Sequence, residues 1–569
     1  MSLLHEIIRK HALKNAFEYG KTAPNLIIGK VINEFPEAKR NINSVMELAQ
    51  EICSQINAME KDAIKAEMSS YSYPEKKEEK KEIELPEAIE GKVVTRFPPE
   101  PSGYLHIGHA KAAFLDYQAA RRYNGKFLLR FDDTNPEKES KEFVDAAISD
   151  LSWLGIIPDQ IIFASDMMEK FYEYACKIIS VNRAYVCTCK KEEIKQRRFE
   201  KKECPCRSRT ENENQNLFSE MVAGNIAEGF ASVRFVGDMS SQNTAMRDPT
   251  LLRIVSSPHY RHGKKYSVWP SYDFEVCIAD SLTGVTHAMR SKEYELRDEL
   301  YFAILDALGL RKPLLVEFSR LNITGMPLSK RLITPLINEG KVEGYDDFRL
   351  PTLRGLARRG ILPEAIKSFV LSFGLSKVES SPTIDSLLSE NKKLIDKSAR
   401  RLFFVKNPVK VEVEKQPRHD FAVIRNHPTE PMGERKIKVG SYFYISDADA
   451  ELLSVGSLFR LKGLYNLEVA MISKSKNTLY CKYAGSEVVA CPKIQWVSDD
   501  YLKCKIKIPL PLFTPQGRFN EENLRVDEGY CEPECSNLSV GSIIQFERYG
   551  FVRLDKKTPE ALEFIFIST

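Results

Sequence analysis

The sequence predicts a multidomain protein that joins an α/β domain with a parallel sheet to all-β modules and a helical front end. Three observations predict this fold class. A strand–loop–helix–strand pattern begins near residue 91, short alternating strands begin near residue 402, and apolar residues recur at helical spacing near the N-terminus. The chain has 569 residues, which at roughly 150 residues per domain allows about three to five domains.

Residues 1–72 are predicted to form a helical module. Leu4, Ile8 and Ala12 recur at the spacing of one helix face. A run rich in Glu and Lys follows, and we interpret residues 73–90 as a charged linker exposed to solvent. Two interpretations of the module stay open: a helical bundle on a tether, or a docking module for a partner or RNA.

An α/β domain is predicted from residue 91 onward. KVVTRF (92–97) and KFLLRF (126–131) have the composition of strands, and HAKAAFLDYQAARRY (109–123) has helical spacing. Units of this kind build parallel, Rossmann-like sheets. We expect the two halves of this domain at 91–189 and 266–325, an insertion at 190–265, a helical connector at 326–400 and two β-barrels at 401–569.

The composition excludes several classes of protein. An apolar fraction of 43% and a charged fraction of 28% are typical of soluble globular proteins, not of collagen-like, disordered or membrane-spanning chains. The N-terminus lacks the apolar core of a signal peptide, so we expect a cytoplasmic protein without membrane association. A net charge of +4 is small for a protein that merely coats nucleic acid, although a local basic face suffices to bind RNA.

The first motif is His106-Ile107-Gly108-His109, at the predicted start of a helix. Free N–H groups at a helix N-terminus attract phosphate, and Gly103 and Gly108 leave the backbone open to a ligand. Two histidines three residues apart can share a helical face and donate to phosphate oxygens. Taken alone, the pair fits ordinary polar histidines better, and a metal site has no third ligand nearby.

The second motif is LSKR (328–331), in a loop that follows Gly325 and Pro327. Two cations and a hydroxyl on such a loop suit a polyphosphate. The triplet Ser-Lys-Arg is common on protein surfaces, so this motif alone predicts little. The two motifs are far apart in the sequence, and only the fold can bring them together.

Together the motifs resemble those of a known enzyme family. RFPPEPSGYLHIGH (96–109) resembles the "HIGH" signature of class I aminoacyl-tRNA synthetases, and LSKR (328–331) resembles a degenerate "KMSKS" loop with Pro327 at the position of the first Lys. RFDDTNP (130–136) and WPSYDF (269–274) narrow the resemblance to the glutamyl/glutaminyl subgroup. The helical front end resembles that of the archaeal-type glutamyl enzymes. The β-rich C-terminal region resembles the anticodon-binding barrels of the archaeal, eukaryotic and glutaminyl members.

The resemblance implies a two-step reaction. Glutamate attacks the α-phosphate of ATP to give glutamyl-adenylate and pyrophosphate, and the terminal adenosine of tRNA(Glu) then takes the glutamyl group. Enzymes of this subgroup generally need bound tRNA for the first step, and Mg²⁺ accompanies ATP. The insertion is expected to hold the tRNA acceptor end, the barrels to bind the anticodon, and the enzyme to act as a monomer.

The resemblance also assigns roles to residues in the two motifs. Catalysis would rest on positioning and charge stabilisation rather than on a covalent intermediate with the protein. The expected catalytic residues are His106 and His109, which would contact the reacting phosphates, and Lys330, which would bind the β/γ end. The expected ATP site combines these three with Pro99, Gly108 and Ser329.

Four further residues match the family's amino-acid pocket. Glutamate has one ammonium and two carboxylates, so the pocket needs one acidic and two basic contacts. Asp132 matches the acidic residue for the ammonium, Arg96 a carboxylate-binding position, and Tyr272 the tyrosine that packs on the amino acid. Arg290 favours glutamate over glutamine, because an amide would leave its guanidinium unpaired. The alternatives are a loop-capping role for Asp132 and a structural role for Arg290.

Four cysteines stand close together, as Cys187-Thr-Cys189 and Cys204-Pro-Cys206. Two pairs of thiols in a reducing compartment suit tetrahedral Zn²⁺, and the alternative is four unligated thiols. Segment 190–209 holds nine Lys or Arg against four Glu. A zinc-held basic knuckle there would bind RNA phosphates.

The barrels carry further candidate RNA contacts. Several cations could meet RNA, although solvated surface charge is the favoured interpretation for several of them: Arg435, Arg460, Lys462, Arg548 and Arg553. Trp496 either stacks on bases or fills a barrel core.

The leading hypothesis is a glutamate–tRNA ligase. The alternatives are a glutaminyl enzyme, which Arg290 disfavours, and a non-discriminating enzyme that also charges tRNA(Gln) with glutamate, which stays open. An RNA-binding paralogue without catalysis is disfavoured by the intact motifs. A truncated relative that modifies tRNA is disfavoured by the full barrel region.

Overall fold

The computed structural model describes residues 3–71, 83–514 and 516–569. The chain divides into two compact units, Met1–Lys80 and Lys81–Thr569. Residues 73–82, most of the predicted linker, lie outside the described residues. The described remainder of that segment packs on the second unit, because Ile83 and Leu85 are buried in an apolar cluster with Val93 and Leu115.

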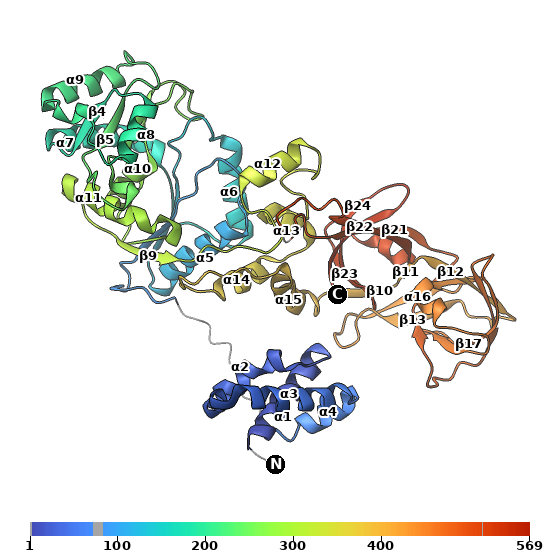
Figure 1. The fold of residues 1–569 in the computed structure, drawn as a ribbon. Coiled ribbons are helices and arrows are strands. Elements are labelled where there is room, and N and C mark those ends of the chain that lie inside the picture. The colour runs from blue at the N-terminus through green and yellow to red at the C-terminus, as the bar shows by residue number, and fades with distance from the viewer. Residues whose placement is uncertain (1–2, 72–82, 515) are drawn as a thin grey trace. The chain divides into compact units, whose positions relative to one another are not determined.

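The N-terminal unit is a bundle of helices (Figure 1). Its helices are α1 (Leu3–Tyr19), α2 (Pro24–Glu34), α3 (Ile42–Asn57) and α4 (Lys61–Met68), with a 3-10 turn at Pro36–Asn41. Ile8 and Ala12, two of the residues predicted to share a helix face, are buried in its core, and Leu4 packs against that core. The predicted helical character of this region is confirmed.

The α/β domain contains parallel pairs of strands. β1 (Val94–Phe97), β2 (Lys126–Phe131) and β3 (Gln160–Phe163) pair in parallel in that order, and β8 (His287–Ser291) pairs with β9 (Leu314–Phe318). β8 lies beside β1, since the Thr286 N–H donates to the Val94 carbonyl at 2.9 Å. The strands therefore lie in the spatial order β3–β2–β1–β8–β9, and the direction in which successive strands are added changes between β1 and β8. In open α/β sheets, ligands bind outside the carboxyl ends of the strands at such a point.

Two helices connect the first three strands. α5 (Ile107–Arg122) follows β1, and α6 (Lys141–Trp153) follows β2. Ala113 and Ala120, seven residues apart in the segment with helical spacing, are both buried in the core of this domain. The Ser140 hydroxyl accepts the Phe143 N–H and caps α6. The predicted strand–loop–helix–strand unit is confirmed.

An antiparallel sheet interrupts this domain. Its strands, in order, are β4 (Ala184–Cys187), β5 (Ser232–Phe235), β6 (Thr250–Ile254) and β7 (Val268–Pro270). The helices α7 (Met168–Ser180), α8 (Lys191–Phe199) and α9 (Glu211–Val222) accompany it at the upper left of Figure 1. The sheet uses strands on both sides of the predicted insertion, and β7 leads into α10 (Tyr272–Leu282) and then α11 (Asp298–Leu308).

The connector between the α/β domain and the C-terminal region is helical, as predicted. It contains α12 (Lys330–Asn338), α13 (Leu353–Arg359), α14 (Pro363–Leu371) and α15 (Ile384–Ile395). Thr352 caps α13 by accepting the Gly355 N–H, and Leu353 donates its backbone N–H to the Leu105 carbonyl at 2.9 Å. The connector therefore touches the loop that precedes α5.

The C-terminal region forms two seven-stranded sheets with half-barrel shapes. One sheet has the order β19–β16–β17–β18–β12–β15–β20, and the other has the order β10–β23–β24–β25–β21–β22–β11. The strands are β10 (Arg400–Leu402), β11 (Phe404–Lys406), β12 (Pro408–Glu414), β15 (Phe443–Ser446), β16 (Leu458–Leu461), β17 (Asn466–Ser473), β18 (Thr478–Tyr483), β19 (Lys493–Ile494), β20 (Val497–Ser498), β21 (Leu502–Pro509), β22 (Leu524–Cys531), β23 (Ile543–Phe546), β24 (Gly550–Lys557) and β25 (Leu562–Ser568), with a separate hairpin of β13 (Phe421–Arg425) and β14 (Glu434–Lys438). The first sheet is thus inserted between the strands of the second.

Two of the five candidate cations in the barrels are buried and therefore do not belong to the solvated group. Arg435 is buried, with its Nε 2.6 Å from Glu532 Oε1, and Arg460 is buried, with its Nη1 donating to Asn466 Oδ1 at 2.8 Å. Each side chain meets an acceptor inside the fold, which a strand pattern cannot reveal. The other three cations form ion pairs: Lys462 with Glu547, Arg548 with Asp449, and Arg553 with Asp555.

Trp496 is fully buried, with its ring 5.1 Å from that of Phe443. Of the two alternatives for this residue, the structure supports packing in a barrel core. Within the described part of the chain, the helices are all too short or too polar to cross a bilayer.

Candidate active site

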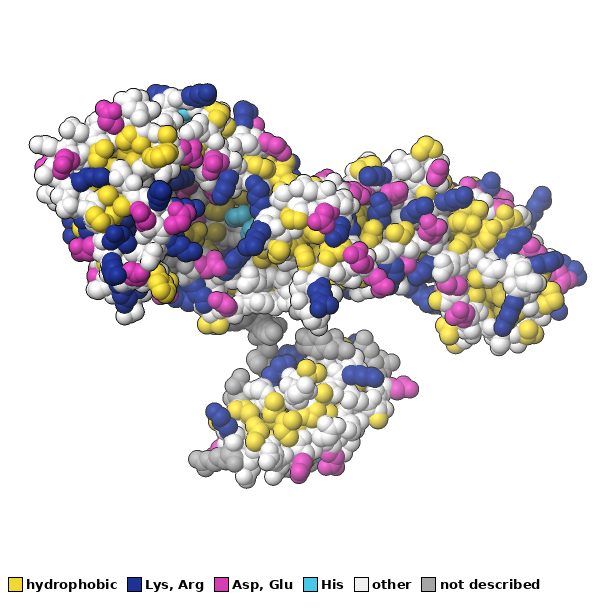
Figure 2. Space-filling view, turned by 45° about the horizontal axis from the view of Figure 1, so that its top comes forward, with side chains coloured by type: hydrophobic (Ala, Val, Ile, Leu, Met, Phe, Trp, Pro, Cys, Tyr) yellow, Lys and Arg dark blue, Asp and Glu magenta, His cyan; other side chains and the backbone are white. Residues whose placement is uncertain are grey.

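A cleft of about 750 Å³ opens at the ends of β1 and β8, where the strand order reverses. Figure 2 shows histidine side chains recessed in a hollow with Lys and Arg side chains near its edge. The residues predicted for ATP and glutamate all line this cleft: Arg96, Pro99, His106, Gly108, His109, Asp132, Tyr272, Arg290, Ser329 and Lys330. The fold therefore brings together both motifs and the proposed amino-acid pocket.

The two histidines of the first motif lie at the N-terminus of α5. The Gly108 N–H donates to His106 Nδ1, and the His106 N–H donates to His109 Nδ1, each at 3.1 Å. Because each Nδ1 accepts a hydrogen bond, a neutral ring carries its proton on Nε2. Burial and neighbouring positive charge lower the pKa of His106 well below its usual value and that of His109 to about 4. Both rings are thus neutral Nε2–H donors at pH 7.

The His106 ring places a steric requirement on Gly108. A Cβ at this position would lie 2.9 Å from His106 Cε1 and 3.0 Å from His106 Nδ1. Any other residue would push the imidazole away from the Gly108 N–H that it accepts. The predicted role of Gly108 in exposing the backbone is thus joined by a steric one.

Lys330 links the second motif to the first. It begins α12, and its Nζ donates to the Ser102 carbonyl and lies 5.2 Å from the centre of the Phe143 ring. A Cβ on Gly103 would be 3.6 Å from Lys330 Cδ, so the loop before α5 and the lysine stem are in close contact. Both motifs therefore face the same end of the cleft.

Arg96 lies at the end of β1 within a buried charge network. Its Nε and Nη2 donate to Asp280 at 2.8 and 3.2 Å, and its Nη1 donates to the Met289 carbonyl at 2.7 Å. Arg130, from the end of β2, donates from Nη1 to the same Asp280 at 2.5 Å. Two guanidinium groups thus share one buried carboxylate beside the cleft.

Asp132 follows β2 and accepts a hydrogen bond from Arg130 Nε at 2.7 Å. Burial raises the pKa of Asp132 despite the charge of Arg130. Glu275 of α10 is buried nearby, and its pKa is raised well above the usual value by burial and then by the charge of Asp132. Both carboxyl groups face Arg130, whose Nε is 2.7 Å from Asp132 Oδ1 and 3.8 Å from Glu275 Oε1.

Tyr272 and Arg290 also line the cleft. Tyr272 stands at the start of α10, with its ring 5.0 Å from that of Tyr294. Arg290, at the end of β8, is 6% exposed and donates from Nη2 to Asp298. Its buried Nε has no hydrogen-bond partner among the described residues. Asp298 thus fixes one edge of the guanidinium while other donors stay open to a carboxylate.

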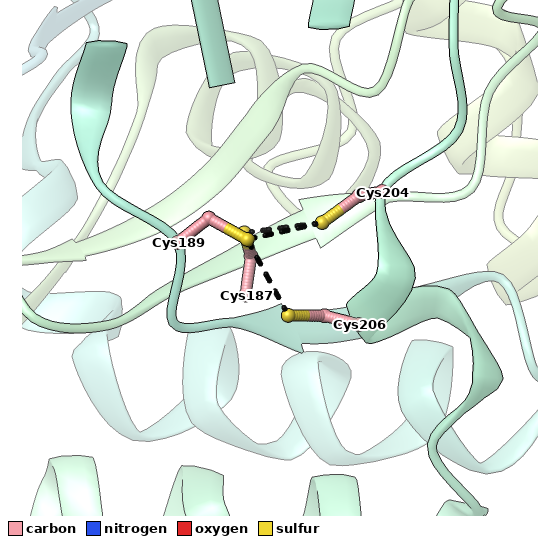
Figure 3. A group of neighbouring side chains, drawn as sticks. All are labelled: Cys187, Cys189, Cys204 and Cys206. Carbon is pink, nitrogen blue, oxygen red and sulfur yellow. Dashed lines mark hydrogen bonds between the residues drawn. The ribbon is translucent and has the colours of Figure 1, made fainter. Parts of the chain in front are cut away.

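The four clustered cysteines converge in the structure (Figure 3). All four sulfur atoms lie within 4.8 Å of one another. Cys189 Sγ is 3.6 Å from Cys204 Sγ and 3.8 Å from Cys206 Sγ, and Cys187 Sγ is 3.6 Å from Cys204 Sγ. A tetrahedron with Zn–S bonds of about 2.3 Å has edges of about 3.8 Å. Although burial opposes ionisation, neighbouring donors and Arg209 bring the pKa of Cys206 to about 7.

Comparisons with known proteins bear on the whole chain. A family model described as "tRNA synthetases class I (E and Q), catalytic domain" matches residues 92–397, and two models described as the anti-codon binding domain of this class match 399–484 and 493–555. A glutamate–tRNA ligase from Nitrosopumilus maritimus (strain SCM1) is 46% identical, covering 97% of this chain and 98% of that relative. One from Cenarchaeum symbiosum (strain A) is 42% identical, covering 96% of this chain and 97% of the relative.

The chain belongs to the class I tRNA synthetases of the E and Q group. A further relative, the glutamate–tRNA ligase of Pyrococcus abyssi, is 40% identical, with 97% of both chains covered. The synthetase catalytic model spans the α/β domain, its interrupting sheet and the helical connector, and the anticodon models fall on the two half-barrels.

Sequence reasoning missed several residues that build the synthetase cleft. Arg130 begins the motif RFDDTNP (130–136), but the motif does not indicate that its guanidinium binds Asp132 and Asp280. Asp280 and Asp298 lie outside all of the motifs. Lys111 was also missed: it is buried under the cleft, donates from Nζ to the Ser319 carbonyl at 2.5 Å, and burial lowers its pKa to about 8. The available signal for Lys111 is that it shares a face of α5 with the apolar residues Leu115 and Ala119, which are both buried.

Proposed function

We propose that the chain ligates L-glutamate to the 3′ end of tRNA(Glu) in an ATP-dependent reaction through glutamyl-adenylate. The observation that carries this proposal is that one cleft is lined by the Arg290 guanidinium together with the two histidines and Lys330. Membership of the E and Q synthetases and relatives named as glutamate–tRNA ligases support the reaction class.

The first step needs charge stabilisation at the α-phosphate of ATP. The neutral Nε2–H groups of His106 and His109 would donate to phosphate oxygens, and the Lys330 ammonium would offset the charge of the β/γ end. Pro99, Gly108 and Ser329 line the same part of the cleft. Mg²⁺ would enter with ATP as part of the substrate. Positioning then brings the glutamate carboxylate into line with the α-phosphate.

Glutamate recognition would divide among four residues. Asp132 would bind the ammonium, Arg96 a carboxylate, and Tyr272 the flank of the amino acid. Arg290 would pair with the side-chain carboxylate through the donors that Asp298 leaves open. Glutamine would place an NH₂ group against that guanidinium, so the enzyme would reject it.

The test is glutamate-dependent exchange of pyrophosphate into ATP, measured with and without tRNA and compared with glutamine. We expect exchange with glutamate in the presence of tRNA(Glu) and much less with glutamine. Absence of glutamate-dependent exchange under both conditions would overturn the proposal. Charging of purified tRNA(Gln) with glutamate in the same preparation decides whether the enzyme is non-discriminating.

We further propose that the cysteine cluster (Cys187, Cys189, Cys204 and Cys206) holds one structural Zn²⁺. Its support is the sulfur spacing, which fits a tetrahedral site, and its place in the sequence: two cysteines precede the basic segment 190–209 and two lie within it. This segment would grip the tRNA acceptor end. Cys189→Ser should lower the zinc content measured by mass spectrometry, whereas the exposed Cys176→Ser should leave it at one per chain. A wild-type protein purified without chelators and free of zinc would overturn this site.

The remaining parts of the proposal concern partners. The two half-barrels would bind the anticodon of tRNA(Glu), because models for anticodon-binding domains match them. We propose that the enzyme acts as a cytoplasmic monomer, as expected for this subgroup. Sedimentation of the purified chain with and without tRNA tests the oligomeric state, and a stable dimer would contradict it.

A further inference from the structure

The loop after β2 carries two adjacent carboxylates, of which one faces the cleft and the other is buried in the protein. Asp132, Thr134, Asn135 and Glu139 line the cleft, whereas Asp133 is fully buried. The proposed reaction uses Asp132 and gives no role to Asp133. Burial of a carboxylate is costly unless it is well hydrogen-bonded, so the contacts of Asp133 indicate what this residue does.

The Asp133 carboxylate joins two segments that are far apart in the sequence. The Ser165 N–H and hydroxyl donate to Oδ1 and Oδ2, each at 2.8 Å, and the Tyr260 hydroxyl donates to Oδ2 at 2.9 Å. Ser165 lies in the 3-10 turn Ala164–Met167 that follows β3, and Tyr260 lies in the turn between β6 and β7. These hydrogen bonds therefore fix the Asp132 loop against both segments.

His259, next to Tyr260, faces the same loop. Its Nδ1 accepts the N–H groups of Arg261 and His262 at 3.2 and 3.3 Å, which places the proton of the neutral ring on Nε2. This Nε2 is 3.6 Å from Glu139 Oε2 and 3.8 Å from Asp133 Oδ2. Neither Nε2 nor Glu139 Oε2 has a hydrogen-bond partner among the described residues. A small shift would pair them and draw the loop toward the turn.

The turn is a compact element that contacts both the Asp132 loop and Trp269. The backbones of His259 and Gly263 exchange two hydrogen bonds of 2.8 Å, which close residues 259–263. The His259 ring packs 4.9 Å from that of Trp269, three residues before Tyr272. The turn thus touches the Asp132 loop directly and approaches Tyr272 through Trp269.

We propose that Tyr260 and His259 are positioning residues, which hold the loop so that the Asp132 carboxylate meets the glutamate ammonium. This inference rests on the proposed function, because it assigns the two residues to the amino-acid pocket of that reaction. Neither residue needs to touch substrate. Loss of the Tyr260 hydroxyl would leave the Ser165 hydroxyl as the remaining donor to Asp133 Oδ2 and would remove the hydrogen bond from the turn to the loop. The loop would then sample positions in which Asp132 is misplaced.

The test compares Tyr260→Phe with Tyr172→Phe in tRNA-dependent pyrophosphate exchange. Tyr172 is a matched control, because its half-buried hydroxyl also makes one hydrogen bond, to the Val268 carbonyl at 2.8 Å, and it does not line the cleft. We expect Tyr260→Phe to raise KM for glutamate at least fivefold, with KM for ATP and Tm close to those of Tyr172→Phe. His259→Ala should act in the same way, and His259→Gln, which keeps an N–H donor, should recover most of the lost affinity.

Each outcome decides the inference. Equal KM values for glutamate in Tyr260→Phe and Tyr172→Phe would overturn it. A parallel rise in KM for glutamate and ATP with a lower Tm would also overturn it, since that pattern indicates general destabilisation. Failure of wild-type enzyme to exchange with glutamate is a separate result, which overturns the proposed function before any variant is compared.

Discussion

Asp280→Asn tests the buried charge network beneath the cleft. Asp280 is fully buried and accepts hydrogen bonds from Arg96, from Arg130 at 2.5 Å, and from the Tyr301 hydroxyl at 3.0 Å. Burial alone would raise the pKa of Asp280, but the two guanidinium groups hold it below its usual value. Asparagine keeps the shape of the side chain and removes its charge, so both arginines lose a compensating anion.

The expected loss follows from the burial of this site. Removal of one partner from a buried ion pair costs about 3–5 kcal/mol of unfolding free energy. The unfolding entropy of a domain is about 2.1 cal/mol/K per residue. If the catalytic region at 92–397 unfolds as one unit, its Tm should therefore fall by about 5–8 °C. KM for glutamate should rise as well, because Arg96 loses the carboxylate that orients it.

The assay is urea and thermal unfolding followed by circular dichroism, with Asp145→Asn as the control. Asp145 also pairs with a cation, Lys141, at 2.7 Å, but both side chains are more than half exposed. Such a pair is worth about 0.3–0.5 kcal/mol. A loss below about 1 kcal/mol for Asp280→Asn, or one equal to that of the control, would refute the reasoning from buried charge.

Three further predictions concern the cleft. The pKa of His109 is about 4 in the folded state and about 6.5 in the unfolded state, so the unfolded state takes up the proton first and stability falls as pH drops from 6.5 to 4. Between pH 7 and pH 5, the free energy of unfolding of His109→Gln, measured in urea, should fall by about 2 kcal/mol less than that of the wild type. Equal falls in the two proteins would contradict this. Arg290→Cys should lower kcat/KM for glutamate about 10- to 150-fold, because one hydrogen bond to a charged group is lost. Unchanged glutamate kinetics would show that Arg290 does not bind the side-chain carboxylate of glutamate. Gly108→Ala should lower the rate of pyrophosphate exchange about tenfold, because the added Cβ displaces the His106 ring. Alanine has a higher helix propensity than glycine, so the loss would not come from a weaker α5. A fully active variant would show that the ring adapts.

The fold could be predicted in outline because its signals are local. Strand composition, helical spacing and the loop between them sufficed for β1, α5 and β2, and alternating short strands sufficed for the C-terminal region. The pairing of those strands could not be predicted. Residues 400–406 join the sheet formed by residues 502–568, across an intervening sheet, and pairing over such distances leaves no periodic trace in a single sequence.

The sequence by itself determined the residue types of this synthetase cleft: two histidines at a helix start, a Ser-Lys pair on a loop, an acid and two arginines, and two pairs of cysteines. Only the tertiary structure decided how they are used. It placed Asp280 between Arg96 and Arg130, set Asp298 against Arg290, and buried Arg435 and Arg460 inside the barrels. The physical reason is that a buried charge takes its partner from whichever strand or helix packs against it, and packing brings together residues whose separation in the sequence carries no signal.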